Sequence, residues 1–263
     1  MSKPRLEGKV AIITGAASGI GEATARLFAE NGAFVVIADI QDELGQSVAA
    51  SIGLDKSSYR HCDVRDENQV QETVTFTLEK YGRIDVLFSN AGIIGPPTSI
   101  LDMNLEELDN TIAVNVRGVA ATIKHVARAM VQHKTRGSII CTMSVAGIVG
   151  GTGPHAYSTS KSALIGLVRS TASELGKDGI RVNGVSPHGV ATPLSCGLSG
   201  TEPSQVEAIC SSTSCLKGVV LKTRHVAEAV LFLASDESLF ISGHNLAVDG
   251  GFSVVNGGFV LYQ

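Results

Sequence analysis

Six short apolar runs recur along the chain, and longer segments with helical spacing of their apolar residues lie between them. Most of the runs have no polar face, which is typical of strands that are buried on both sides of a parallel sheet. The pattern predicts strands at "KVAIIT" (9–14), "FVVIAD" (34–39), "DVLFSN" (85–90), "SIICTMS" (138–144), "RVNGVSP" (181–187) and "NLAVDG" (245–250).

The segments between the runs have the pattern of amphipathic helices. After the first run, one helix face would carry Ile20, Ala23, Leu27 and Phe28. Strands that alternate with helices predict an α/β fold, a single Rossmann-type doubly wound parallel sheet with helices on both faces. The chain has no repeat, linker or low-complexity tract, so we expect residues 1–263 to form one domain.

The segment 190–216 interrupts this alternation with Pro, Gly and Ser. We expect it to be a mobile insertion over the carboxyl edge of the sheet, where it would contact substrate. Between His188 and Lys217 the only charged residues are Glu202 and Glu207. An anionic substrate would find no partner there, so the insertion predicts a small, neutral, hydrophobic substrate.

Composition narrows the class of protein. Of 263 residues, 44% are apolar and 17% charged, which is typical of a globular domain. A net charge of −4 without blocks of like charge argues against nucleic acid as a partner. The first residues lack the apolar core of a secretory signal, and the longest uncharged run is too rich in Gly to be a membrane helix. Five cysteines without paired spacing predict reduced thiols, no metal site and a cytoplasmic location.

A glycine-rich turn, "TGAASGIG" (14–21), follows the first predicted strand. Gly15, Gly19 and Gly21 would allow a tight turn, close approach of the backbone to a pyrophosphate, and a helix N-terminus that attracts anionic oxygen. Alone, this signal is weak, because plain strand-to-helix turns look similar. Asp39 strengthens it, because the carboxylate ends the second strand about 20 residues later, where it would bind a ribose diol.

Asp39 also favours NAD over NADP, since a 2′-phosphate beside this carboxylate would bring like charges together. Positions 16, 17, 40 and 41 offer no Lys or Arg to offset such a phosphate. The alternative is that Asp39 only forms a turn. Asp63 and Asn90 lie at the ends of later strands and face the same edge, but either could be an Asx-turn residue.

A tyrosine and a lysine share the helix predicted at 155–172, where Tyr157 and Lys161 are four positions apart and so lie on one face. Lowering a phenol pKa from about 10 to about 7 needs roughly 4 kcal/mol, close to what a cation about 4 Å away supplies at an effective dielectric of about 20. Lys161, helped by the positive ring of an oxidised nicotinamide, would make Tyr157 the general base that takes an alcohol's proton.

Two further polar residues are candidates for the same site. Ser144 ends a predicted strand and would donate a hydrogen bond to the substrate oxygen. Asn115 is a poor helix former inside a helical segment, which invites a functional explanation. Each residue also has a plainer reading. A buried Tyr can be core, a Ser can cap a strand end, and a Lys can be a solvated surface charge.

Taken in order, "TGAASGIG", "SNAG", "AVNVRG", Ser144, "YSTSK" and "VNGVSP" resemble the short-chain dehydrogenase/reductase family over about residues 7–252. The resemblance implies a catalytic tetrad of Asn115, Ser144, Tyr157 and Lys161. In this tetrad Lys161 would also bind the nicotinamide ribose, and Asn115 would bind a water that links the lysine to solvent. It implies a cofactor site lined by Gly15, Ser18, Gly19, Ile20, Gly21, Asp39, Ile40, Asp63, Val64, Asn90, Tyr157, Lys161, Val190 and Thr192.

The chain departs from the family pattern after the strand at 181–187, where the family commonly has Pro-Gly and this chain reads Ser-Pro-His-Gly. His188 would then lie at the rim of the nicotinamide pocket, either as a substrate contact or as a structural hydrogen-bonding residue. The residues expected to contact substrate are Gly150, His188 and Leu194.

Longer stretches, among them "SIICTMSVAG" and "SPHGVATPL", are similar to plant terpenoid and lignan alcohol dehydrogenases. This resemblance implies NAD-dependent oxidation of a hydrophobic secondary alcohol or lactol, of the cyclic monoterpenoid kind exemplified by borneol, isopiperitenol and nepetalactol. One alternative is a non-redox cyclase or isomerase that binds NAD without consuming it, suggested by His188 and the glycine-rich segment 147–153. Another is a nucleotide-binding module without catalysis. The family also implies a homotetramer, assembled through two long helices and a C-terminal strand, for which this chain offers "HNLAVDGG" (244–251) and "FSVVNGGFV" (252–260).

Overall fold

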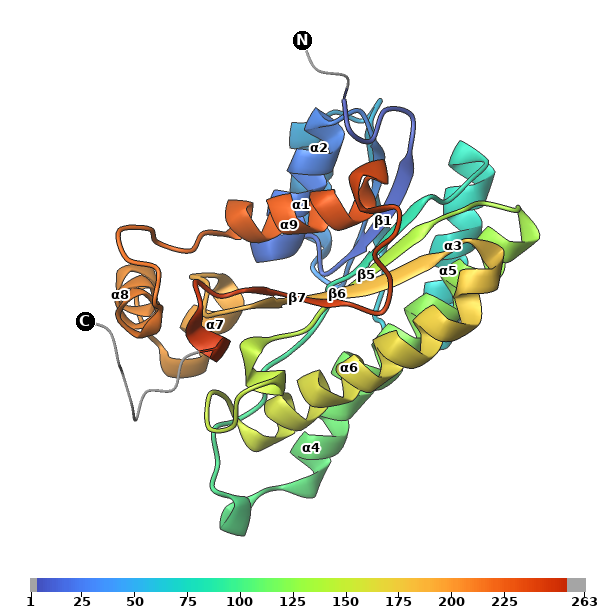
Figure 1. Cartoon of the computed structure of the whole chain (residues 1–263). Coiled ribbons are helices and arrows are strands. Elements are labelled where there is room, and N and C mark those ends of the chain that lie inside the picture. The colour runs from blue at the N-terminus through green and yellow to red at the C-terminus, as the bar shows by residue number, and fades with distance from the viewer. Residues whose placement is uncertain (1–3, 255–263) are drawn as a thin grey trace.

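Seven parallel strands form one sheet in the computed structural model, which describes residues 4–254 (Figure 1). The spatial order is β3-β2-β1-β4-β5-β6-β7. The chain therefore starts in the middle, builds one half outward and returns to build the other, which confirms the doubly wound α/β fold. The strands are β1 (Val10–Thr14), β2 (Phe34–Asp39), β3 (Ser57–His61), β4 (Val86–Ser89), β5 (Ser138–Thr142), β6 (Arg181–Pro187) and β7 (Asn245–Val248).

Helices cover both faces of this sheet. In Figure 1, α1, α2 and α9 lie on one side of the strands, and α3, α5 and α6 lie on the other. The helices are α1 (Gly19–Glu30), α2 (Asp42–Ile52), α3 (Glu67–Tyr81), α4 (Leu105–Ile112), α5 (Val119–Gln132), α6 (His155–Leu175), α7 (Pro193–Ser199), α8 (Pro203–Thr213) and α9 (Thr223–Ala234).

The core has two layers, one on each face of the sheet. Ile13 of β1 packs with Phe28 of α1 and Leu231 of α9 in the first layer. Its neighbour Ile12 points the other way and packs with Met130 of α5 in the second layer. Both isoleucines are at most 2% exposed. A central strand with two buried faces needs adjacent apolar residues, which is why the strands read as continuous apolar runs.

All six predicted strands are present, but the apolar runs did not include β3. Its sequence, "SSYRH", is polar because β3 is an edge strand with one neighbour, β2. Ser57 is fully buried there and its hydroxyl donates to the carbonyls of Ala49 and Gly53. Hydrogen bonds to the end of α2 thus take the place of apolar contacts. The apolar residues that would have identified β3 as a strand in the sequence are therefore missing.

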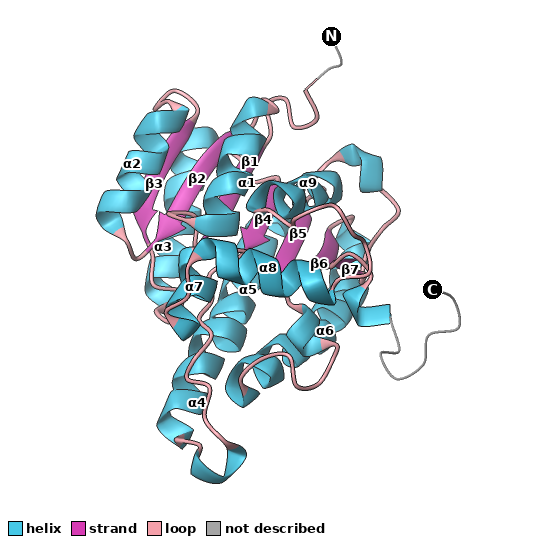
Figure 2. Cartoon of the chain, turned by 90° about the vertical axis from the view of Figure 1, so that its left-hand side faces the viewer, coloured by secondary structure: helices cyan, strands magenta, loops and turns pink. Residues whose placement is uncertain are grey.

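The insertion at 190–216 contains two helices, α7 and α8, which the sequence pattern did not predict. Figure 2 shows them in front of the edge at which the strands end. Thr192 begins α7 with a capping box, in which its side chain accepts from Ser195 N and the Ser195 hydroxyl accepts from Thr192 N. The expected position over the carboxyl edge is therefore correct, while the mobility of this segment remains a prediction.

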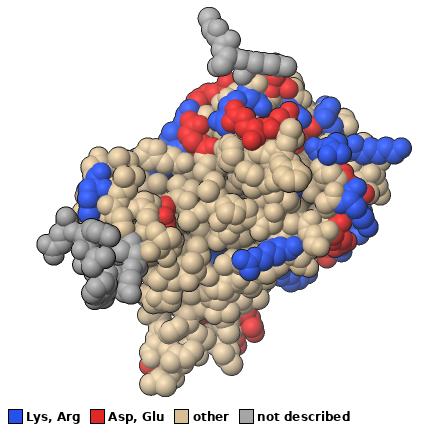
Figure 3. All heavy atoms as spheres, in the orientation of Figure 1, with Lys and Arg blue, Asp and Glu red and all other residues tan. Residues whose placement is uncertain are grey.

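Charged side chains are unevenly distributed. In Figure 3 they gather at the top and right of the molecule, whereas the lower left, around α4, α6 and α7, is mostly uncharged. Within residues 4–254, no helix combines the length and apolar character needed to cross a membrane.

Candidate active site

The glycine-rich turn joins β1 to α1 in a geometry that only glycine permits. Gly15 has a φ of +64°, and a Cβ there would lie 2.8 Å from the Cα of Ala91. A Cβ at Gly21 would lie 2.1 Å from the Gly15 carbonyl oxygen, and one at Gly19 would lie 3.3 Å from Cγ2 of Thr192. The turn is therefore packed against itself, against the loop after β4 and against the start of α7.

Gly21→Ala is expected to lower the free energy of unfolding by about 1–3 kcal/mol, because the added methyl overlaps backbone that has no room to move. Gly166→Ala is a matched control in α6, where nothing lies within 4 Å of an added Cβ. That change should instead stabilise the chain by about 0.5–1 kcal/mol, the usual gain for Ala over Gly inside a helix. Urea unfolding of both variants measures the contrast, and equal midpoints would show that the turn tolerates a side chain.

Asn90 holds this turn in place. Its side-chain amide donates to the carbonyls of Thr14 and Gly15 at 3.1 and 3.0 Å, and its Oδ1 accepts from the Thr142 hydroxyl at 2.9 Å. The residue thus ties the ends of β1, β4 and β5 together. Its expected contact with cofactor remains a prediction, since all three side-chain interactions are structural.

Asp39 lies where the sequence placed it, at the end of β2 and only 6% exposed. Its Oδ2 accepts from the backbone N–H of Ala17, inside the glycine-rich turn, and its Oδ1 accepts from that of Gln41. The carboxylate is therefore fixed beside the turn. The Gln41 side-chain amide also donates to Oδ1, at 3.4 Å, so Oδ2 is the oxygen with a second lone pair that can accept from a ribose hydroxyl.

A hydrogen-bonded group supports the end of β2 from outside. The Tyr59 hydroxyl donates to the Asp39 carbonyl and to the Asp42 carboxylate, both at 2.7 Å, and His61 contacts the same carboxylate at 2.9 Å. The Tyr59 ring packs where a Cβ of Gly45 would lie, 2.2 Å away. The sequence reading missed this group, although a glycine inside an amphipathic helix was a usable signal of close packing.

Asp63 forms a local pair. The backbone N–H of Arg65 donates to its Oδ1 at 2.9 Å, and the Arg65 guanidinium contacts both carboxylate oxygens. This hydrogen bonding lowers the pKa of Asp63. The Asx-turn alternative describes this geometry, and a cofactor contact would require sharing the carboxylate with Arg65. The neighbouring Val64 is buried and packs against Gly118, whereas Ile40 is 57% exposed.

Tyr157 and Lys161 lie on one face of α6, as the spacing predicted. The Lys161 Nζ is 5.5 Å from the centroid of the tyrosine ring. It also donates a 2.7 Å hydrogen bond to the carbonyl of Thr142, at the end of β5. Lys161 is 3% exposed, and burial lowers the pKa of its ammonium to about 8. The reading of this lysine as a solvated surface charge is therefore wrong.

The phenol of Tyr157 differs from the expectation in one respect. Burial raises its pKa, and a hydrogen bond from Ser144 acts in the opposite direction. The Lys161 ammonium lies over the ring and donates to the Thr142 carbonyl. In the chain alone the phenol is thus held neutral, and a further positive charge is needed to make it a base.

Ser144 is oriented to act on the phenol. Its Oγ accepts from the backbone N–H of Ala146 at 3.1 Å and caps the short helix Val145–Gly147. That contact leaves the hydroxyl proton available to donate to Tyr157. Ser144, which is 9% exposed, therefore has a capping role, although at a short helix rather than at the strand end, and its catalytic role remains a prediction.

Asn115 lies in a π-helical turn, Ala113–Gly118, between α4 and α5. It is fully buried, and its amide exchanges hydrogen bonds with the backbone of Ile93 and donates to Ser160. A Cβ at Gly92 would lie 3.2 Å from its Oδ1 and 3.6 Å from the Lys161 Nζ. Asn115 and Lys161 therefore border the same small space, although the water-holding role of Asn115 remains a prediction.

The three residues expected to contact substrate, Gly150, His188 and Leu194, differ in their surroundings. The His188 ring stacks on Phe252 at 4.3 Å, and its Nε2 contacts the Thr213 hydroxyl at 2.9 Å. This imidazole therefore fastens α8 to the segment after β7, as its structural reading predicted. Gly150 has open space around it, and Leu194 of α7 is 44% exposed.

These residues fit a nicotinamide dinucleotide. Ser18 precedes α1 without capping it by a side-chain hydrogen bond, so the first N–H groups of the helix are available to a pyrophosphate. Asp39 supplies an acceptor for a ribose, and Tyr157 and Lys161 lie on α6, from which Lys161 reaches the end of β5. The described residues contain no group of three or more His, Cys, Asp or Glu suited to a metal ion.

Comparison with known proteins agrees with this site. The family described as enoyl-(acyl carrier protein) reductase matches residues 15–253. Short-chain dehydrogenase reductase 3b of Arabidopsis thaliana is 64% identical over 97% of this chain and 99% of its own length. Momilactone A synthase of Oryza sativa subsp. japonica is 50% identical over 98% and 95%. The crystal structure of levodione reductase superposes with a TM-score of 0.88 at 31% identity, covering 96% of this chain and all of that one.

A family match over most of the chain, close plant relatives and a shared fold all point the same way. The chain belongs to the short-chain dehydrogenase/reductase family, whose members are oxidoreductases that bind a nicotinamide cofactor.

Proposed function

We propose that this protein oxidises a neutral, hydrophobic secondary alcohol or lactol with NAD, and that the substrate is a cyclic terpenoid. The observation that carries the proposal is the convergence of Ser144, Tyr157 and Lys161 at one edge of the sheet, with Ser144 bonded to the phenol and the ammonium over its ring. When bound, the nicotinamide accepts the hydride of the substrate carbinol.

The residues of the chain have separate roles. When the alcohol is bound, Ser144 donates to the substrate oxygen instead of the phenol, and so orients the alcohol. Tyr157 takes the hydroxyl proton. Lys161 fixes the nicotinamide ribose, and its charge combines with that of the oxidised nicotinamide to lower the phenol pKa. Asn115 positions the loop after β4 against α6, which keeps Lys161 in place.

The segment over the site supports a neutral substrate. Leu194 and Leu198 of α7 are partly exposed, and so is Ile209 of α8. Glu207 is paired with Lys222, so the charge of one of the two acids in the segment is already neutralised. An apolar ring system would bury these side chains without leaving a polar group unpaired.

Turnover on a panel of alcohols tests the proposal. The protein is incubated with NAD and either cyclic terpenoid alcohols, lactols or phosphorylated alcohols, and reduced nicotinamide is followed by absorbance. Products are identified by mass spectrometry. Reduction of NAD with the neutral alcohols, and none with the phosphorylated ones, is expected. No turnover on any hydroxylated terpenoid would contradict the substrate class.

The choice of NAD is expected to depend on Asp39. Asp39→Ala should lower the ratio of kcat/KM for NAD to that for NADP by about 10- to 10³-fold, since the variant removes a charge next to the 2′-position. Glu43→Gln, an exposed acid on the adjacent α2, is the control and should leave the ratio nearly unchanged. An unchanged ratio in Asp39→Ala would show that Asp39 only forms the turn.

The two directions of the reaction should depend oppositely on pH. Burial raises the pKa of Tyr157, so the phenol is protonated at neutral pH. Alcohol oxidation needs the deprotonated form and should speed up as the pH rises, whereas carbonyl reduction needs the protonated form and should slow down. Profiles of kcat/KM in both directions measure this. Parallel profiles would assign the titration to another group.

No observation among residues 4–254 favours the non-redox cyclase. That alternative depended on His188 and on the glycine-rich segment 147–153. His188 contacts Thr213 and Phe252, and burial lowers its pKa. We further propose a cytoplasmic homotetramer, to be checked by light scattering. One of the two segments expected to assemble it, 252–260, lies largely outside the described residues; the other, 244–251, includes the edge strand β7.

A further inference from the structure

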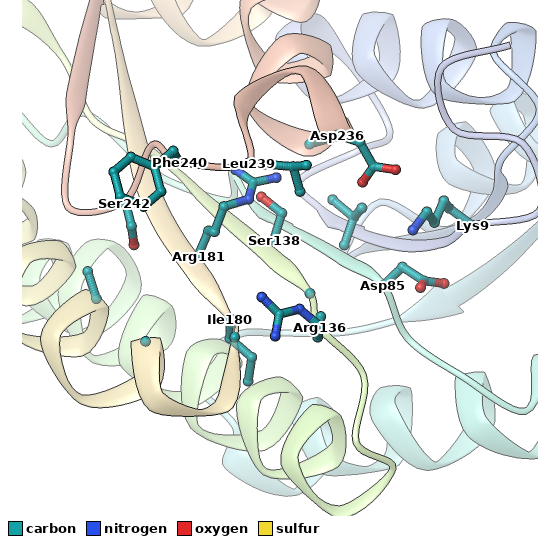
Figure 4. Close-up of a pocket in the computed structure, with 16 residues that line it drawn as sticks. Lys9, Asp85, Arg136, Ser138, Ile180, Arg181, Asp236, Leu239, Phe240 and Ser242 are labelled. Atoms are coloured by element: carbon teal, nitrogen blue, oxygen red, sulfur yellow. The ribbon is translucent and has the colours of Figure 1, made fainter. Parts of the chain in front are cut away.

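A cavity of about 410 Å³ opens at the opposite end of the sheet from the tetrad (Figure 4). It is lined by the first residues of three central strands: Val86 of β4, Ser138 of β5 and Arg181 of β6. The tetrad and the glycine-rich turn lie beyond the other ends of these strands. The cavity is thus separate from the candidate active site, and its volume falls within the range of about 300–1,000 Å³ typical of small-molecule sites.

The charge of the cavity wall is positive, in contrast to the chain as a whole. Lys9, Arg136 and Arg181 line it together with Asp85 and Asp236. Asp85 carries no spare charge, because both its oxygens accept from the Arg83 guanidinium, at 2.8 and 2.6 Å. Three cations therefore share the cavity with one remaining carboxylate, Asp236, whose charge acts on Arg181.

Two of these cations are available to a ligand. Among the described residues, no hydrogen bond or ion pair uses the side chain of Lys9 or Arg136. Arg136 lies over Gly179, where a Cβ would be 2.8 Å from Cζ of the guanidinium. The bare glycine, with a φ of +73°, thus makes room for the arginine.

The third cation is fixed in position. Arg181 donates to the carbonyls of Leu233 and Ser235 and to the hydroxyl of Ser238. Burial lowers the pKa of this guanidinium, so its charge is poorly solvated. A bound anion would offset that cost. In Figure 4, Arg181 lies next to Ser138, Arg136 lies below them, and Lys9 lies on the right beside Asp85.

Apart from Ser138 and Ser242, the other side chains of the wall are apolar. Ile180 and Ala172 form one side. Leu239 and Phe240 form the rim and are 68% and 105% exposed, although both are large hydrophobic residues. Such side chains gain free energy when an apolar ligand covers them.

We propose that this cavity binds a small amphipathic carboxylate, with the carboxylate between Arg136, Lys9 and Arg181 and its apolar body against Phe240 and Leu239. Guanidinium groups match the geometry of a carboxylate, and the apolar rim selects against small inorganic anions. The site is independent of the proposed function, since it shares no residue with the tetrad or the glycine-rich turn.

Isothermal titration calorimetry with 4-phenylbutyrate tests the site, and the neutral 4-phenylbutanol serves as the matched probe. We expect the carboxylate to bind at least tenfold more tightly than the alcohol. Arg136→Ala and Lys9→Met should each raise the Kd of the carboxylate at least threefold, and the double variant at least tenfold. Arg128→Ala, an exposed cation on α5 that does not line the cavity, should leave the Kd unchanged.

Two further titrations locate the ligand. Tyr157→Phe should bind 4-phenylbutyrate as the wild type does, and saturating NADH should not displace it. Phenyl phosphate tests whether a phosphate can replace the carboxylate, and we expect it to bind more weakly. Equal binding of acid and alcohol, an unchanged Kd in the double variant, displacement by NADH, or no binding at millimolar probe would each overturn the proposal.

Discussion

Replacing Tyr157 by phenylalanine is expected to lower kcat for alcohol oxidation by about 10²–10⁴, the range typical of a lost general base. The phenol oxygen is bonded to Ser144, and the Lys161 ammonium lies 5.5 Å from its ring. The variant loses the proton acceptor but keeps the ring that packs against α6 and the loop before it. The Kd for NAD should therefore change little, and calorimetric binding together with steady-state kinetics measures both quantities.

Tyr59→Phe is the control, because it removes a phenol that lies near Asp39 and not near the tetrad. Its kcat should stay within a few-fold of the wild type, although its Kd for NAD can rise as the end of β2 loosens. Substantial turnover in Tyr157→Phe would move the proton transfer to another residue. A folded variant that no longer binds NAD would instead give Tyr157 a binding role.

The fold was predictable because the sheet is buried on both faces. Adjacent apolar residues such as Ile12 and Ile13 identify a central strand without any structure. The edge strand β3, with its buried Ser57 and Ser58, lacks this signal, whereas the other edge strand, β7, has enough apolar residues to be predicted. The helices α7 and α8 were also missed. A segment rich in Gly, Pro and Ser has no clear helical spacing of apolar residues, although both helices begin with a capping box.

The candidate site was predictable only in part. Spacing alone placed Tyr157 and Lys161 on one helix face, because a helix fixes the relation of residues four apart. Contacts between distant elements were not predictable in the same way. The bond from Lys161 to the Thr142 carbonyl depends on how α6 crosses β5. The pairing of Asp63 with Arg65 depends on a loop conformation that composition does not determine.

The hydrogen bond from Lys161 to the Thr142 carbonyl helps the protein to keep the lysine's charge in its interior. A buried ammonium costs free energy unless it is bonded, and Lys161 has one carbonyl partner. Burial lowers its pKa from 10.5 to about 8, so at neutral pH the folded chain carries a cation that the unfolded chain would solvate better. The residue that the reaction needs is therefore one that the fold tolerates at a cost.

Lys161→Met is accordingly expected to abolish turnover and stabilise the chain at once. Each pKa unit corresponds to about 1.36 kcal/mol, so the lowered pKa costs about 3 kcal/mol at neutral pH. Leaving the Thr142 carbonyl without its donor offsets about 1 kcal/mol, and the net gain should be about 2 kcal/mol. Because the folded pKa lies below the unfolded one, the cost is fully present below about pH 8 and disappears as the pH rises towards 10.5.

The stability of the wild type should therefore rise between about pH 8 and 10.5 relative to that of Lys161→Met. Above this range the wild type should be the more stable of the two by about 1 kcal/mol, because the neutral amine keeps its hydrogen bond to Thr142. Urea unfolding across this range measures the difference, and kinetics with NAD measures a loss of kcat of about 10²-fold or more. Lys177→Met is the control, because Lys177 is exposed to solvent in the short 3₁₀ helix Gly176–Asp178 that follows α6. It should alter neither the stability nor kcat. A destabilised Lys161→Met variant at neutral pH would show that the hydrogen bond to Thr142 outweighs the cost of the buried charge, and that the lysine is retained for the fold as much as for the reaction.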